Sequence, residues 1–293
     1  MRSKKPRALV IRIGALGDVL LTRRLTYSLS LDGFQSTLLA PGRHASLLLA
    51  DPWIEDVLDS DSARYSRAFA GVWPEGERRF DLAVVISRSE DLASACESAA
   101  ARVNVVPPTP PRDDQSIAWQ WAESVCSTFR GHLPALPTLS PAEGIEGATL
   151  VHPGSGSPAK NWPLHRFVEL SRRLKEQGHR VVWVQGPAEA FLSLDAWDGE
   201  RLDQPSLETL AASLARCRLF IGNDSGVSHL AAAVGAPTVS IFGPTNAKVW
   251  RPDGLRVEIM AAPAGSLEAI GVEEVLTACL RMAKLGDNAA KNS

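Results

Sequence analysis

The sequence predicts two α/β domains, each built on a parallel sheet, that face each other across a cleft. Three observations predict this fold class. Short apolar runs alternate with segments of helical period along most of the 293 residues, a proline- and glycine-rich stretch divides the chain near its middle, and the length suits two domains of typical size. Strands that alternate with helices form parallel sheets covered by helices on both faces.

The first domain is expected over residues 1–140. An apolar run at 8–13 predicts its first strand, the turn Gly14-Ala15-Leu16-Gly17-Asp18 follows, and helical spacing continues over 19–31. Further elements of this half are expected as strands at 37–40, 82–86 and 103–106 and as a closing helix at 117–129.

A change of composition predicts the domain boundary. The stretch from 131 to 147 has no periodicity and is crowded with turn formers, namely Pro134, Pro137, Pro141, Gly144 and Gly147. The second domain is expected over residues 147–285. Its strands are expected at 149–152, 180–185, 219–221 and 238–242, and its helices at 164–177, 207–215, 227–234 and 272–284.

Composition excludes several classes of protein. The 31 basic and 33 acidic residues nearly cancel, so we expect no nucleic-acid partner. Four widely spaced cysteines without a C-x-x-C pair favour a reducing compartment and argue against a disulfide framework or a metal site. No apolar run approaches the ~20 residues of a membrane span. We therefore expect a cytoplasmic protein, with peripheral membrane contact left open.

The segment Gly222-Asn223-Asp224-Ser225-Gly226-Val227-Ser228-His229 is the most informative in the chain. It follows an apolar run and precedes a helix rich in small residues, an order that indicates a buried strand, a tight polar turn and a helix. The free backbone N–H groups and the helix dipole at such a turn favour an anion. An ordinary cap by Asp224 or Ser225 explains this segment equally well, and packing or capping is the usual role of a residue placed like His229.

A loop of small residues, 152–163, leaves the first strand of the second domain. Ser155 and Gly156 would let a ligand approach the backbone closely, and Lys160 adds a point charge suited to phosphate. The G-x-x-x-x-G-K-[ST] spacing of a Walker loop is absent, and a plain connection with a surface lysine is the alternative. Glu189, after the next strand, is expected on the same sheet edge, as a partner of ribose hydroxyls or as an exposed helix-start residue.

The first domain offers one candidate base. Asp18 follows a G-x-x-G turn and would lie at a helix N-terminus, where it could take a proton from a substrate hydroxyl. The alternative is a favourable first-turn charge worth ~0.5 kcal/mol. Several arginines, Arg23 and Arg24 among them, make this half locally basic, which suits an anionic acceptor or a solvated surface.

Four segments in order, RIGALGDVLLT, HPGSGSPAKNWP, GPAE and GNDSGVSHLAAAVGAPTVSIFGPT, together resemble the ADP-heptose:lipopolysaccharide heptosyltransferases, glycosyltransferase family 9. The resemblance implies the GT-B fold and inverting sugar transfer. It implies that Asp18 is the general base and that Lys160 neutralises the diphosphate leaving group. It further implies a nucleotide-sugar site formed by Ser155, Gly156, Lys160, Glu189, Asp224, Ser225, Gly226 and His229.

The resemblance also implies the reaction and its partners. The protein would move a sugar, heptose from ADP-heptose, to a lipopolysaccharide-core or related glycolipid acceptor, at the cytoplasmic face of the inner membrane. No cofactor is required, and assistance by Mg²⁺ stays open because no carboxylate pair or histidine cluster demands it. In the GT-B pattern the last helix, here 272–284, often returns to the first domain. The alternatives are a non-catalytic sugar-nucleotide-binding protein and a GT-B-like epimerase or hydrolase.

Overall fold

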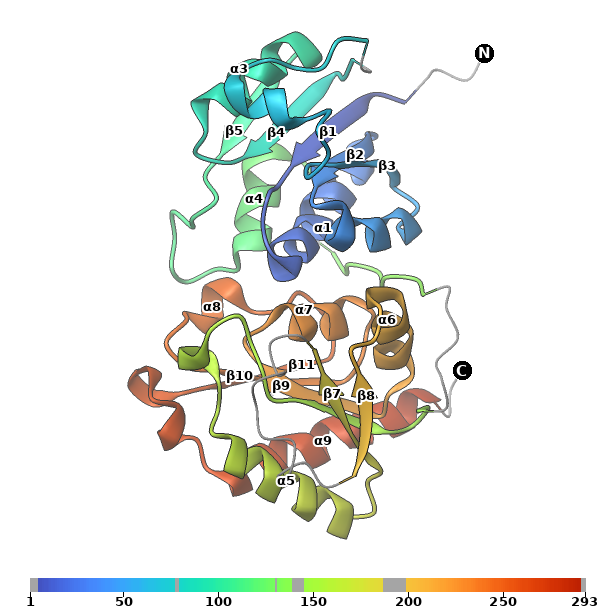
Figure 1. Ribbon diagram of the computed structural model, residues 1–293, viewed down its shortest axis with the longest axis vertical. Helices are drawn as coiled ribbons and strands as arrows, with labels where there is room; N and C mark the ends of the chain where they lie inside the picture. The colour runs from blue at the N-terminus through green and yellow to red at the C-terminus, as the bar shows by residue number, and fades with distance from the viewer. Residues whose placement is uncertain (1–4, 77–78, 130, 139–144, 187–198, 291–293) are drawn as a thin grey trace. The chain divides into compact units, whose positions relative to one another are not determined.

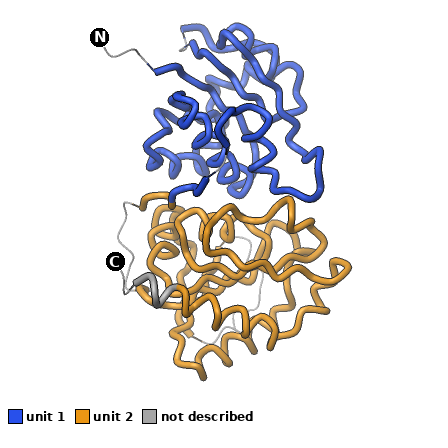
Figure 2. Tube along the Cα trace, turned by 180° about the vertical axis from the view of Figure 1, so that it is seen from behind, with its two compact units in different colours: residues 1–134 blue, residues 135–293 orange. Residues whose placement is uncertain are grey.

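The chain divides into two compact units, residues 1–134 and 135–293 (Figure 2). The computed structural model describes residues 5–76, 79–129, 131–138, 145–186 and 199–290. Each unit is an α/β layer structure in which a sheet lies between helices (Figure 1). None of the helices in this described part is both long and apolar enough to cross a bilayer.

The first unit holds a five-stranded parallel sheet in the order β3-β2-β1-β4-β5. Helices α1 and α4 pack together on one face, and α3 with the short helix at Ser66–Ala70 covers the other. The strands are β1 (Arg7–Ile11), β2 (Gln35–Ala40), β3 (Ile54–Asp59), β4 (Leu82–Ile86) and β5 (Val103–Val106). The helices are α1 (Leu16–Leu31), α2 (Gly42–Ala45), α3 (Glu90–Ala99) and α4 (Ile117–Val125).

The second unit holds a six-stranded parallel sheet in the order β11-β10-β9-β6-β7-β8. Two parallel α/β domains confirm the predicted fold class. The strands are β6 (Thr149–His152), β7 (Val181–Gln185), β8 (Glu200–Asp203), β9 (Leu219–Asn223), β10 (Thr238–Phe242) and β11 (Val257–Ala261). The helices are α5 (Leu164–Glu176), α6 (Leu207–Arg216), α7 (Gly226–Ala233), α8 (Ala247–Trp250) and α9 (Val272–Ala290).

Three strands were not predicted from the sequence, and all three lie at sheet edges. β3 at one edge of the first sheet, and β8 and β11 at the two edges of the second, have largely half-buried or exposed residues. The central strands are buried on both faces and therefore form continuous apolar runs. The three missed edge strands are interrupted by charged residues, so their hydrophobic pattern is too weak to recognise.

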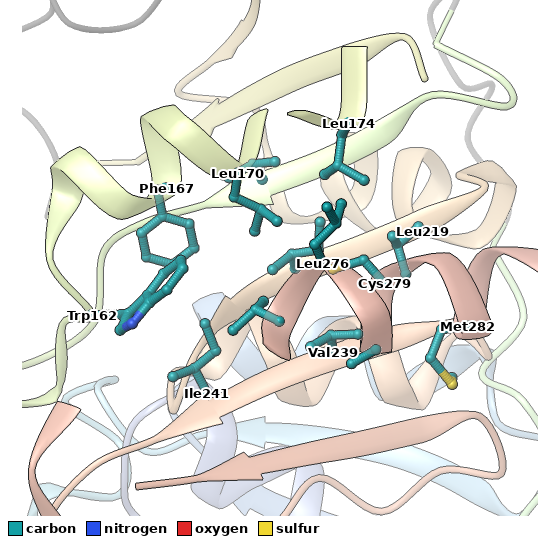
Figure 3. Close-up of a cluster of buried hydrophobic side chains, with 14 of the residues drawn as sticks. Trp162, Phe167, Leu170, Leu174, Leu219, Val239, Ile241, Leu276, Cys279 and Met282 are labelled. Carbon is teal, nitrogen blue, oxygen red and sulfur yellow. The ribbon is translucent and has the colours of Figure 1, made fainter. Parts of the chain in front are cut away.

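Helix α9 packs into the core of its own unit. Its buried residues Leu276, Cys279 and Met282 lie in one cluster with α5 and with strand residues such as Val239 (Figure 3). Its apolar face is buried in that cluster, and the expectation that the last helix returns to the first domain stays a prediction. That face completes the second sheet's covering layer, because β9 and β10 would otherwise expose their apolar side chains to water.

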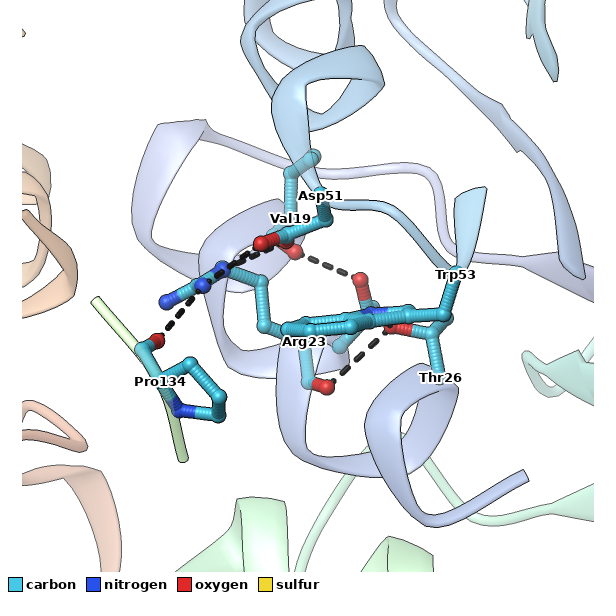
Figure 4. Close-up of polar contacts among 7 residues, drawn as sticks. Val19, Arg23, Thr26, Asp51, Trp53 and Pro134 are labelled. Carbon is cyan, nitrogen blue, oxygen red and sulfur yellow. Dashed lines mark hydrogen bonds and ion pairs between the residues drawn. The ribbon is translucent and has the colours of Figure 1, made fainter. Parts of the chain in front are cut away.

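Two arginines of α1 are buried, contrary to their interpretation as acceptor-binding or solvated residues. Arg23 is 1% exposed and forms a bidentate ion pair with the fully buried Asp51, with N···O distances of 2.7 and 2.8 Å (Figure 4). It also donates to the Pro134 carbonyl at 2.9 Å, and Arg24 donates to the Gly131 carbonyl at 2.8 Å. Segment 131–134 is thus tied to α1.

The environment of Asp51 is dominated by burial. Burial raises the pKa of the Asp51 carboxyl, and the hydrogen bonds and charge of Arg23 offset part of the rise. A carboxylate in such a place is stable only beside its partner, because an isolated buried charge loses its hydration without compensation.

Replacing Arg23 with Met should lower the free energy of unfolding by about 3–5 kcal/mol, because the Asp51 carboxylate then stays buried without its partner. Urea denaturation followed by circular dichroism measures the loss. The double variant Arg23→Met/Asp51→Leu should recover most of it, since an apolar pair needs no hydration. A single variant as stable as the parent protein would contradict this account of the ion pair.

Candidate functional site

The pairing of β6 with β9 creates the candidate site in the second unit. The chain runs outward from β6 to β7 and β8, then returns to place β9 on the other side of β6. His152 at the end of β6 lies opposite Gly222 in β9, so the loops that follow these two strands emerge side by side. In open α/β sheets ligands bind at this kind of switch point, outside the carboxyl ends of the strands.

The loop after β6 has the exposed, small-residue character that its sequence predicted. Gly156 is exposed, and a Cβ atom at this position would meet no other atom within 4 Å. The Ser155 hydroxyl is engaged inside the loop, 2.8 Å from the Ser157 carbonyl and 2.6 Å from the Asn161 side-chain oxygen. Ser155 therefore shapes the loop, and the accessible backbone around Gly156 is the surface that a ligand could approach.

The turn after β9 leads directly into α7. Ser225 is the N-cap residue, and its hydroxyl accepts a hydrogen bond from the Ser228 backbone N–H at 3.5 Å. Gly226 is the first residue of the helix, and His229 is buried in its first turn. The capping interpretation of Ser225 is thus correct. A capped N-terminus still presents the positive end of the helix dipole to the sheet edge, so a cap and an anion site are compatible.

Lys160 and Asp224 join the two segments. The Lys160 Nζ atom lies 2.7 Å from Asp224 Oδ2, and the lysine side chain is 35% exposed while the aspartate is only 7% exposed. The sequence separation is 64 residues, so this ion pair exists only because β6 and β9 are neighbours. The lysine can exchange its partner for an incoming anion, because it is the more accessible of the two.

Glu189, another predicted contact at this sheet edge, lies outside the described residues. β7 ends at Gln185 beside β6, and the chain is described again from Gly199. The role of Glu189 toward ribose hydroxyls stays a prediction.

In the first unit, Asp18 lies in the first turn of α1, after the central strand β1. Its carboxylate accepts a hydrogen bond from the Arg12 guanidinium, and its Oδ2 atom accepts one from the Ala15 backbone N–H at 3.2 Å. The Asp18 side chain is 27% exposed. A Cβ atom on Gly14 would lie 2.7 Å from the Asp18 Cβ atom, so glycine is required there. Asp18 is therefore held in place and accessible, as a base must be.

Sequence reasoning gave no role to two further residues around Asp18, Arg12 and His44. The Arg12 guanidinium lies 5.4 Å from the centroid of the Trp121 ring, and this cation–π contact helps to hold the guanidinium in place. His44 lies 3.3 Å from the Gly14 carbonyl through Nδ1, and burial lowers the pKa of its imidazole. A carbonyl only accepts, so Nδ1 carries the proton and donates. Both contacts come from distant segments and arise on folding.

Sequence reasoning also missed Asn223. This fully buried residue ends β9 and contacts the neighbouring loop at both of its ends, through Pro153 and Trp162. Among the described residues, no group of three or more histidine, cysteine, aspartate or glutamate side chains could hold a metal ion.

The residues that form this site lie in a stretch of the chain that matches a known protein family. Residues 135–275 match the model of glycosyltransferase family 9 (heptosyltransferase). The second unit belongs to glycosyltransferase family 9. Lipopolysaccharide heptosyltransferase 2 of Salmonella typhimurium is 31% identical over 99 residues, which are 30% of this chain and 28% of that protein. The chain spans about a quarter to a half of the length of the curated relatives it matches.

Solved structures show the same fold over nearly the whole chain. The family 9 glycosyl transferase of Veillonella parvula superposes with a TM-score of 0.78 at 18% identity and covers 97% of this chain and 98% of that one. The heptosyltransferase WaaC of E. coli, solved with ADP, gives a TM-score of 0.73 at 18% identity over 92% of this chain and 98% of that one. The fold is that of the GT-B glycosyltransferases.

Gly222 lies where β9 pairs closely with β6, so a substitution there tests whether this strand pairing requires glycine. A Cβ atom here would lie 2.8 Å from the Cζ atom of the buried Phe220 ring and 3.2 Å from the His152 carbonyl oxygen. Gly222→Ala should therefore cost about 1–3 kcal/mol of stability in urea denaturation. Gly271→Ala is the matched control, because a Cβ atom at Gly271 meets open space. Equal effects of the two substitutions would refute the steric account.

Proposed function

We propose that this protein is an inverting glycosyltransferase that moves heptose from ADP-heptose to a hydroxyl of a lipopolysaccharide-core or related glycolipid acceptor. The observation that carries the proposal is the ion pair between Lys160 and Asp224 beside the N-terminus of α7, within a unit that belongs to glycosyltransferase family 9. The E. coli WaaC structures with ADP and with ADP-2-deoxy-2-fluoro heptose support the choice of donor.

The second unit would bind the donor. The diphosphate lies at the N-terminus of α7, where backbone N–H groups at Ser225 and Gly226 and the helix dipole favour negative charge. Lys160 leaves Asp224 for the diphosphate and neutralises the charge that ADP gains as it departs. Asp224 is then free to accept hydrogen bonds from hydroxyls of the donor sugar. Ser155 and Gly156 shape the loop that lies against the phosphates, and His229 packs in the first turn of α7.

The first unit would activate the acceptor. Asp18 takes the proton of the acceptor hydroxyl. The hydroxyl oxygen of the acceptor attacks the anomeric carbon from the face opposite to ADP. One bond forms between that oxygen and the anomeric carbon, and the bond from the anomeric carbon to the diphosphate breaks with both electrons on ADP. A single displacement of this kind inverts the anomeric centre and needs no nucleophilic carboxylate. A glycolipid acceptor implies peripheral contact with the membrane that carries it.

Asp18→Asn should reduce the rate of heptose transfer about 10²- to 10⁴-fold, because the amide cannot take the hydroxyl proton. ADP release from ADP-heptose in the presence of acceptor measures the rate, and isothermal calorimetry should show ADP affinity within about twofold of the parent. Asp91→Asn is the matched control, since it removes an exposed first-turn carboxylate from α3. Full transfer by Asp18→Asn would show that Asp18 is only a helix-dipole charge.

Lys160→Met should weaken ADP binding by about tenfold to a hundredfold, the range expected for a hydrogen bond to a charged group. The loss has two sources, because the diphosphate loses a cation and meets the unneutralised Asp224 carboxylate. Lys284→Met removes the same charge from an exposed position on α9 and should leave the ADP dissociation constant unchanged. If the parent protein binds neither ADP nor any ADP-sugar, the proposed function is wrong.

A further inference from the structure

The loop 153–162 is anchored at both ends by one side chain. The Asn223 Nδ2 atom donates to the Pro153 carbonyl at 2.7 Å, and its Oδ1 atom accepts from the Trp162 backbone N–H at 3.0 Å. Pro153 is the first residue after the end of β6, and Trp162 lies two residues before the start of α5. The amide of Asn223 therefore connects the first and the last residue of the loop, Pro153 and Trp162.

The side chain itself has little freedom to move. Asn223 is 0% exposed, and its backbone carbonyl accepts a hydrogen bond from the Ser228 hydroxyl at 2.5 Å, which ties it to the first turn of α7. The Trp162 end is anchored as well, because its indole lies in the hydrophobic core edge-to-face with Phe167, at 5.0 Å between ring centroids (Figure 3). The Trp162 Nε1 atom also donates to the Ile270 carbonyl at 3.0 Å.

The chemistry of the two bonds requires an amide. Pro153 offers a carbonyl, which only accepts, and Trp162 offers an N–H, which only donates, so one donor and one acceptor must stand on the same short side chain. A carboxylate at this position would keep the bond to Trp162 and repel the Pro153 oxygen. An aliphatic side chain would leave both buried backbone groups without a hydrogen-bond partner, which is costly.

The position of Asn223 in the sequence couples the loop to the turn. The next residue, Asp224, is the ion-pair partner of Lys160, and Lys160 lies inside the loop that Asn223 bridges. One residue thus fixes the distance between the loop that carries the lysine and the turn that begins α7. We propose that Asn223 is a positioning residue that sets Lys160 against the diphosphate of the nucleotide; this inference rests on the proposed function of Lys160.

A residue that acts through Lys160 differs measurably from one that only stabilises the fold. The effect of a positioning residue on ADP affinity disappears when Lys160 is removed, whereas the effect of general destabilisation persists. A double-mutant cycle on the ADP dissociation constant separates the two. The four proteins are the parent, Asn223→Asp, Lys160→Met and the double variant, each as the full chain and titrated with ADP by calorimetry.

Asn223→Asp should weaken ADP binding about tenfold in the parent and less than about twofold in the Lys160→Met background. Asn223→Leu should behave in the same way, which excludes the new charge as the cause. Leu214→Ala is the control for lost stability, because it removes buried methyl groups from α6 of the same unit, outside the cluster that contains Trp162. An Asn223 effect of equal size in both backgrounds would overturn the proposal, as would unchanged affinity in folded Asn223 variants.

A second measurement keeps the inference independent of nucleotide binding. Hydrogen exchange of the intact protein should show faster exchange of the Trp162 N–H and of its neighbours in the loop in Asn223→Leu, with protection of β10 unchanged. Unchanged exchange in the loop would overturn the positioning role even if the protein binds ADP well. If the parent binds no ADP while loop exchange rises in the variant, the proposed function fails and the anchoring of the loop by Asn223 stands.

Discussion

The parallel pairing of β6 with β9 is the constraint on which the candidate site depends. It places two strands from distant parts of the chain side by side, with His152 opposite Gly222, so that both following loops leave the same edge. The pairing is tight enough that only glycine fits at position 222. Everything that gives the site its chemistry follows from this register, since a slip by one residue would turn every side chain to the opposite face of the sheet.

Two polar contacts convert that register into a defined arrangement of charges. Asn223 bridges the ends of the loop after β6, and the ion pair of Lys160 with Asp224 connects that loop to the turn before α7. The Asn223 side chain is buried, whereas the ion pair is open to solvent on the lysine side. In the proposed function, a buried anchor beside an accessible lysine would suit a site that holds an anion and later releases it.

The first unit also has a strand that leads through a glycine turn into a helix. Its central strand β1 also leads into a glycine turn at a switch point, and Gly14 leaves room for Asp18 to fold back against Arg12 and the Ala15 N–H. Deeper in this unit, the buried pair of Arg23 and Asp51 ties α1 to segment 131–134. The burial of this pair shows that Arg23 and Asp51 have a structural role.

The sequence by itself indicated the alternation of strands and helices, a domain boundary within 131–147, and the segments that carry Asp18, Lys160 and Asp224. These features are local, because a strand buried on both faces must be apolar and a turn before a helix must be small and polar. Only the tertiary structure decided which edge strands complete the sheets, where the apolar face of α9 is buried, and that Arg23 is an interior residue. Only it revealed how Arg12 and Asn223 contact the site. The hydrogen bonds of Asn223 join β9 to the loop after β6, and these segments are neighbours only because of the strand order. Arg12 lies beside Trp121, which comes from a distant helix, and no short segment of the chain specifies either contact.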